Sequence, residues 1–192
     1  MAKADHTKEL IANALRQLVQ EKHYSDITVA DIVKQADISR HTFYYHFKDK
    51  QDLLQWIYLH ARENANIISA SNHTEDAAVR LMDQIQQNSL LYTQARYDTS
   101  QNGLLELDFQ ENYRFTMEKI RMYLGDRELP DSIGHLIATY FTWANTQSAF
   151  DILEGKINIS HQDYNKTITM LTEQGLFATL DQLATPSSKN KP

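Results

Sequence analysis

Apolar residues recur at intervals of three and four near the start of the chain, which is the spacing of one face of an α-helix. This spacing predicts a helix from about Thr7 to Lys22, with the Thr7 hydroxyl as its N-cap. The apolar face consists of Leu10, Ile11, Ala14, Leu15 and Leu18. The sequence HYSD that follows lacks the spacing, so we expect the helix to end before it.

A second, shorter helix is predicted after this break. Thr28 can cap it, and Asp31 three positions later completes a variant of the capping box. Its buried face would hold Val29, Ile32, Val33 and Ala36. The sequence ADIS then indicates a tight turn, with Asp37 at a position that requires a positive φ; Asp tolerates this better than most residues.

Two further helices follow the turn. Ser39 is expected to cap a helix over Arg40–Phe47, and Asp49 to cap the next one, which should continue to about Ala70. Beyond the polar sequence SNHT the apolar pattern lengthens, and glycines stand near the expected helix ends. The longer helices are predicted at residues 75–96, 104–124, 131–154 and 160–184.

The chain has 5 Gly and 3 Pro among 192 residues and no sustained strand-like alternation, so we predict an all-α fold. We expect short helices within residues 1–48, a connecting helix over 49–70, longer helices within 71–184 and a disordered tail over 185–192.

Charge is distributed unevenly. The net charge is −6, but residues 1–62 hold 9 Lys and Arg against 8 Asp and Glu, while the remainder holds 10 against 17. The absence of Cys excludes disulfides and thiolate chemistry and fits a reducing compartment. No signal peptide is recognisable, and no apolar run reaches the roughly 20 residues that span a bilayer, so a cytoplasmic location without membrane attachment is expected.

The sequence SRHTFYYHFKDK, residues 39–50, gathers aromatic and basic residues in this otherwise acidic chain. A capped helix, a turn and a second short helix match helix-turn-helix geometry, in which the second helix enters the major groove of DNA. On a helical wheel Phe43 and Phe47 share one face and should anchor the helix. The side chains suited to base edges are His41, Thr42 and Tyr45. Those suited to phosphates are Tyr44, His46, Lys48 and Lys50.

The longer stretch TVADIVKQADISRHTFYYHFKDKQDLL resembles the DNA-binding signature of TetR-family transcriptional regulators, over roughly residues 7–60. Asp37 stands where the family usually has Gly, and Val33 where it often has Ala. The resemblance implies phosphate contacts from Thr28, Tyr44, His46 and Lys50. It implies base contacts from Arg40, His41, Thr42 and Tyr45; Ser39 and Lys48 complete the predicted DNA-binding set.

The same resemblance implies an N-terminal three-helix helix-turn-helix DNA-binding domain over residues 1–48 and a C-terminal helical effector and dimerisation domain over 71–184. It also implies a small-molecule effector whose binding relieves repression, and a homodimer on a palindromic DNA operator, joined by the last two long helices in a four-helix bundle. The candidate apolar positions for this bundle are Ile133, Ile137, Tyr140, Ala144 and Phe150 on the first helix and Ile168, Leu171, Phe177 and Leu180 on the second. The last two long helices resemble those of the branch that includes regulators of dihydroxyacetone kinase operons. Candidate pocket residues are the aromatic side chains Phe109, Tyr113, Tyr140 and Trp143, although aromatic residues at helical spacing more often fill a core.

Three functions stay open from the sequence: a ligand-responsive DNA-binding regulator, acting as repressor or activator; a small-molecule-binding protein with vestigial DNA binding; and a helical module that grips protein. No acid–base pair, nucleophile elbow, phosphate-binding Gly loop or HExxH helix is recognisable, so an enzyme is not expected. His41 and His46 lie five positions apart, a poor spacing for a metal. We expect no metal and no cofactor.

Overall fold

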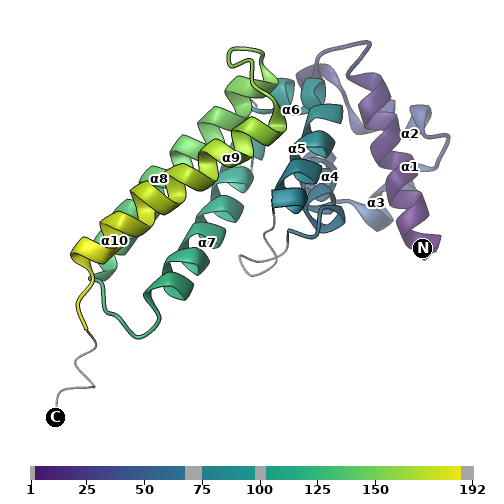
Figure 1. Cartoon of the computed structure of the whole chain (residues 1–192). Coiled ribbons are helices and arrows are strands. Elements are labelled where there is room, and N and C mark those ends of the chain that lie inside the picture. The colour runs from purple at the N-terminus through teal and green to yellow at the C-terminus, as the bar shows by residue number, and fades with distance from the viewer. Residues whose placement is uncertain (1–2, 68–74, 98–102, 187–192) are drawn as a thin grey trace. The chain divides into compact units, whose positions relative to one another are not determined.

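The computed structural model describes residues 3–67, 75–97 and 103–186 (Figure 1). Within these ranges the elements are helices, with one antiparallel bridge between Glu128 and Thr185, so the all-α prediction is confirmed. None of the helices described is long and apolar enough to cross a membrane. The chain forms two compact units that interleave along the sequence. One comprises Met1–Asn64 with Gln84–Leu107, and the other Ala65–Asp83 with Asp108–Pro192.

The first unit is built around the N-terminal helices. In chain order it contains α1 (Lys3–Leu18), the 3-10 turn η1 (Tyr24–Asp26), α2 (Val29–Gln35), α3 (Arg40–His46), α4 (Lys50–Asn64) and α6 (Ser89–Ala95). Its core is formed by large side chains that are almost completely buried, namely Ile11, Leu15, Tyr24, Ile27, Ile32, Phe43, Leu53, Leu54, Ile57, Leu91 and Tyr92. Burial of this apolar surface, at roughly 1.5–3 kcal/mol per large side chain, holds the short α2 and α3 in place.

The predicted boundaries of two helices in this unit are wrong. Helix α1 ends at Leu18, before the predicted end at Lys22. Helix α1 begins at Lys3, so Thr7 lies inside the helix and does not cap it. The residues before Thr7 lack an apolar face, but Lys and Ala favour the helix intrinsically and extend it. Helix α4 ends at Asn64, because Asn66 takes a left-handed conformation with φ 62°. The predicted end at Ala70 lies outside the described residues.

The remaining helices range from 6 to 23 residues in length. They are α5 (Glu75–Gln87), α7 (Leu104–Leu124), α8 (Asp131–Leu153), α9 (His161–Leu171) and α10 (Ala178–Leu183). The predicted helix over 75–96 is broken at Asn88, whose side-chain amide donates to the Gln84 carbonyl at 2.9 Å. The predicted helix over 160–184 contains a π-helical segment, Thr172–Phe177, where a Cβ at Gly175 would lie 3.4 Å from the Phe141 ring.

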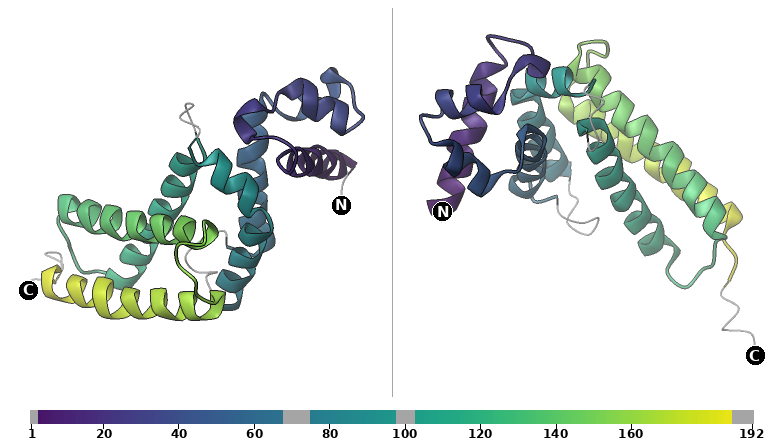
Figure 2. Two further views of the ribbon diagram at one scale, coloured as in Figure 1. Left: turned by 90° about the horizontal axis from the view of Figure 1, so that it is seen from above. Right: turned by 180° about the vertical axis from the view of Figure 1, so that it is seen from behind.

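The core of the second unit lies between α7, α8 and the run from α9 to α10. Its buried centre comprises Ile120, Ile137, Ala138, Leu176 and Leu180. Helix α8 and the α9–α10 run lie side by side along their length (Figure 2). Ile137, Phe150 and Leu180 are buried inside this protomer, so the prediction that they face a partner is wrong.

The end of the chain is tied to this unit through backbone pairing. Glu128 and Thr185 exchange two N–H···O bonds of 2.8 and 2.9 Å. Thr185, the first residue of the predicted disordered tail, therefore has ordered backbone partners. Residues 187–192 lie outside the described part of the structure.

Candidate DNA-binding site

The N-terminus of α2 is fixed by the capping box that the sequence predicts. The Thr28 hydroxyl accepts from the Asp31 N–H at 3.3 Å, and the Asp31 carboxylate accepts from the Thr28 N–H at 2.8 Å. The Lys22 ammonium lies 2.7 Å from the same carboxylate. Its hydrogen bond, followed by those from Thr28, holds the pKa of Asp31 well below its usual range. Because the folded-state pKa is depressed, this contribution to stability is fully present at neutral pH and is lost progressively as the pH falls from the ordinary carboxyl pKa through the depressed folded-state pKa.

The turn between α2 and α3 has the geometry expected of a helix-turn-helix. Asp37 has φ 50°, as predicted from its position, and the Ile38 N–H donates to the Val33 carbonyl at 3.1 Å. This closes the end of α2 in the manner of a Schellman motif. Ser39 then caps α3 by accepting from the Thr42 N–H at 3.0 Å. The positive φ of Asp37 and the Ser39 cap were both predicted, and the structure confirms them. Together they set the direction in which α3 leaves the turn.

Helix α3 has a buried face and an exposed face, as the helical wheel predicts. Phe43 and Phe47 are buried, with 0% and 3% of their surface exposed. Tyr45 on the opposite side is 78% exposed, and Arg40 and His41 are also exposed. Neither Arg40 nor His41 makes a hydrogen bond or ion pair within the described residues. The core therefore supports the helix and leaves its outer side chains available for contact.

The flanks of α3 and the start of α4 carry the other predicted contacts. Tyr44 is 57% exposed, His46 is half-buried and Lys48 is exposed. Asp49 caps α4, as predicted, by accepting from the Asp52 N–H at 2.8 Å. The Thr42 hydroxyl lies 2.9 Å from that of Ser39, so these two side chains support each other. Most of the predicted DNA-binding set thus gathers around α3.

Lys50 differs from the rest of the set, because its ammonium is engaged inside the domain. Its Nζ donates to the carbonyls of Tyr24 at 2.6 Å and Ile27 at 2.8 Å. It also lies 4.2 Å from the centre of the Tyr24 ring. Sequence resemblance alone could not show this role, since the two carbonyls are more than twenty residues away.

We expect Lys50→Met to destabilise the first unit. The variant keeps the aliphatic stem but removes the ammonium that donates to the Ile27 and Tyr24 carbonyls, while the Tyr24 carbonyl still accepts from the Ile27 N–H at 3.2 Å. The expected cost is about 1–3 kcal/mol. Lys48→Met, an exposed neighbour with the same change of charge, should shift stability by no more than about 0.5 kcal/mol. Urea unfolding followed by circular dichroism compares them. Equal stabilities would show that the Lys50 ammonium is dispensable for the fold.

The predicted C-terminal pocket residues are only partly brought together. The Phe109 ring lies 4.6 Å from the Trp143 ring and 5.9 Å from the Tyr113 ring, measured between centroids. The Tyr113 hydroxyl also lies 2.6 Å from His135 Nδ1. Tyr140 is 71% exposed and does not join this cluster.

A polar network in the second unit was missed at the sequence level. The Asp108 carboxyl group, 8% exposed, accepts from the Thr146 hydroxyl at 2.7 Å and the Asn112 amide at 3.1 Å. Thr142 and Thr116, also buried, are joined by a 3.3 Å hydrogen bond between their hydroxyls. In the sequence this network shows only as polar residues on α7 and α8 at positions that are buried in the structure. Helical spacing alone does not distinguish such positions from a polar face exposed to solvent.

Comparison with known proteins agrees with this geometry. Residues 11–57 match the family model described as bacterial regulatory proteins, tetR family. The HTH-type dhaKLM operon transcriptional activator DhaS of Lactococcus lactis is 41% identical over 58 residues, which are 30% of this chain and 31% of that protein. The uncharacterized HTH-type transcriptional regulator YxbF of Bacillus subtilis is 40% identical over 50 residues, 26% of this chain and 13% of that protein. The matches thus span about a third or less of these relatives.

Solved structures extend the likeness to the whole fold. The dihydroxyacetone kinase operon activator DhaS has a TM-score of 0.66 at 22% identity, covering 93% of this chain and 98% of that one. A TetR transcriptional regulator from Streptococcus agalactiae has a TM-score of 0.58 at 20% identity, covering 86% and 95%. The resemblance to TetR regulators, and to the branch that includes regulators of dihydroxyacetone kinase operons, is confirmed. The helix-turn-helix region, residues 11–57, thus matches the tetR family of bacterial regulatory proteins, and the chain as a whole shares its fold with these two solved structures.

Proposed function

We propose that the protein is a sequence-specific DNA-binding transcriptional regulator that inserts α3 into the major groove of a palindromic operator. The observation that carries this proposal is the outer face of α3. A buried Phe43 and Phe47 hold the helix, while Arg40, His41 and Tyr45 point away from the core. An exposed tyrosine with 78% of its surface in solvent has little use in a monomer's own fold.

The side chains divide by chemistry into two roles. Arg40, His41, Thr42 and Tyr45 can hydrogen-bond or contact base edges in the groove, which gives sequence preference. Around them, Thr28, Ser39, Tyr44, His46 and Lys48 can hydrogen-bond phosphate oxygens, which positions the helix. Lys50 supports the second group indirectly, because its ammonium fastens η1 to the start of α4.

Two substitutions test whether the side chains divide into a base-contacting and a phosphate-contacting group. His41→Ala should lower affinity for the operator but not for random DNA, because a good base contact provides about 1–3 kcal/mol of discrimination. Lys48→Ala should weaken binding to both DNAs alike and reduce the salt slope, which is roughly −0.9 per neutralised phosphate. Fluorescence anisotropy with operator and scrambled duplexes at several salt concentrations gives both quantities. If both variants change the two duplexes equally, α3 does not read bases.

A homodimer is part of the proposal. One helix-turn-helix covers few base pairs, so such units act in pairs on half-sites about 34–36 Å apart. In the second unit, Leu136 and Tyr140 of α8 are 64% and 71% exposed, and Met170 and Leu171 of α9 are 47% and 55% exposed. Apolar side chains this exposed on two adjacent helices suit a contact with a second copy of the chain.

The protein could act on transcription in either of two directions, repression or activation. Repression relieved by a small-molecule effector is the usual arrangement that the family resemblance implies. Activation is favoured by the names of two similar proteins, each called an activator of a dihydroxyacetone kinase operon. Deleting the gene and measuring transcripts of the neighbouring operon separates them: transcripts rise if the protein represses and fall if it activates.

A further inference from the structure

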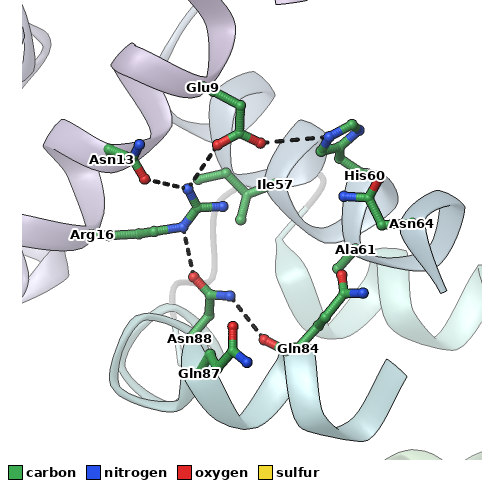
Figure 3. Close-up of a pocket in the computed structure, with 10 residues that line it drawn as sticks. All are labelled: Glu9, Asn13, Arg16, Ile57, His60, Ala61, Asn64, Gln84, Gln87 and Asn88. Carbon is green, nitrogen blue, oxygen red and sulfur yellow. Dashed lines mark hydrogen bonds and ion pairs between the residues drawn. The ribbon is translucent and has the colours of Figure 1, made fainter. Parts of the chain in front are cut away.

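The first unit contains a hollow of about 380 Å³ between α1, α4 and α5, all of whose lining residues belong to that unit (Figure 3). Sites for small molecules commonly occupy about 300–1,000 Å³. Its floor is apolar, from Ile57 and Ala61, and its walls are polar. Five carboxamide side chains line it, together with Glu9, Arg16 and His60.

The opposite charges of Arg16 and Glu9 in this hollow are paired with each other. Arg16 Nη1 lies 3.1 Å from the Glu9 carboxylate, and it donates to the Asn13 amide oxygen at 2.8 Å. Arg16 Nε donates to the Asn88 amide oxygen, also at 2.8 Å. The guanidinium is therefore held in one orientation, with its charge neutralised by Glu9. Its Nη2 makes no hydrogen bond within the described residues. A ligand here gains a fixed N–H donor without needing a net negative charge.

The side-chain carboxamides of Asn64, Gln84 and Gln87 also make no hydrogen bond within the described residues. Each provides both N–H donors and a carbonyl acceptor. A hydroxyl group both donates and accepts, so a molecule with several hydroxyls matches this set better than an anion or a cation. We propose that this hollow binds a small, neutral, hydroxyl-rich molecule, with its carbon frame on Ile57 and its hydroxyls toward the carboxamides and Arg16 Nη2.

A line of ring contacts joins the hollow to the recognition helix. The His60 ring in its wall stacks on Trp56 at 4.7 Å, between centroids. The Trp56 ring lies 5.9 Å from that of Phe47, the residue directly after α3, and the Phe47 ring lies 6.0 Å from that of Phe43 in the buried face of α3. A ligand that moves the His60 ring would therefore move the ring contacts that hold α3 against the core. This second step rests on the proposed function; binding itself does not.

Binding is tested without DNA by the fluorescence of Trp56. The chain has two tryptophans, so Trp143→Phe leaves Trp56 as the sole reporter. Erythritol, xylitol and myo-inositol are titrated as probes. We expect a saturable change in emission with at least one of them. Gln87→Leu should weaken it at least tenfold, whereas Gln86→Leu, on the same helix but outside the hollow, should leave it unchanged. Asn64→Leu, from α4, provides a second disruptive variant.

The outcomes are distinct. A response that never saturates, or that is equal in Gln87→Leu and Gln86→Leu, reports only general exclusion of polyols from the protein surface and overturns the site. Saturable binding of malonate in place of every polyol overturns the neutral, hydroxyl-rich class. If a polyol binds, operator affinity is measured with and without it. A change of at least fivefold, lost in Gln87→Leu, supports the relay, and no change overturns the relay while leaving the site.

Discussion

Replacing Leu136 or Tyr140 with glutamate is expected to convert a dimer into a monomer of 22.3 kDa. The two side chains are four residues apart on α8, so they lie on one face of that helix. A charge buried there without a partner would cost several kcal/mol. Operator affinity should fall by at least a hundredfold, because each monomer would then hold a single half-site. Light scattering at micromolar concentration measures the mass, and anisotropy measures the affinity.

Met122→Glu is the matched control. Met122 is 63% exposed on α7, so the substitution places the same charge on an equally exposed apolar side chain outside the proposed interface. This variant should remain dimeric and bind the operator as the parent does. If the parent is a monomer, or if only Met122→Glu dissociates the dimer, the face of α8 and α9 is not the interface.

Asp108→Ala is expected to cause the largest loss of stability in the second unit, about 3–5 kcal/mol. The substitution removes the acceptor of the Thr146 hydroxyl, which is 1% exposed, and one acceptor of the half-buried Asn112 amide, which also lies 3.4 Å from Thr146 Oγ1. A buried hydroxyl that loses its partner costs about 1–3 kcal/mol, and the cavity left by the carboxyl group adds to this. Urea unfolding followed by circular dichroism gives the free energy of unfolding.

Asp126→Ala removes an exposed carboxyl group just after the same helix and in the same unit, and should change stability by no more than about 0.5 kcal/mol. Thr146→Val keeps the volume and removes the hydroxyl that donates to Asp108 and accepts weakly from the Asn112 amide at 3.4 Å. We expect an intermediate loss for it. Parental stability in both Asp108→Ala and Thr146→Val would mean that the network does not support the fold.

The helix-turn-helix could be predicted closely because its determinants are local. Thr28 with Asp31 and Ser39 with Thr42 are pairs three positions apart that bond their own helix termini. Asp37 marks the left-handed residue of the turn. Such caps depend on the neighbouring residues and little else, so the sequence carries their signal directly.

Features that depend on distant residues could not be predicted. The Lys50 ammonium bonds carbonyls more than twenty positions away, and Arg16 meets Asn88 across 72 positions. The helix break lies at Asn88, whose side chain accepts from Arg16, and the π-helical segment lies where the Phe141 ring packs against Gly175, although the apolar period continues through both. Which face of α8 is buried also depended on its neighbours, and so Leu136 was missed while Ile137 was assigned to the interface.

The most direct test of sequence-specific DNA binding uses the unmodified protein. A labelled duplex from upstream of its own gene, and a scrambled duplex of equal length and composition, are titrated by anisotropy at several salt concentrations. We expect at least hundredfold tighter binding to the native duplex. The logarithm of the binding constant should fall linearly with the logarithm of the salt concentration, with a slope of roughly −0.9 per phosphate contacted. Equal affinity for both duplexes at every salt concentration, or no binding to either, would contradict sequence-specific DNA binding.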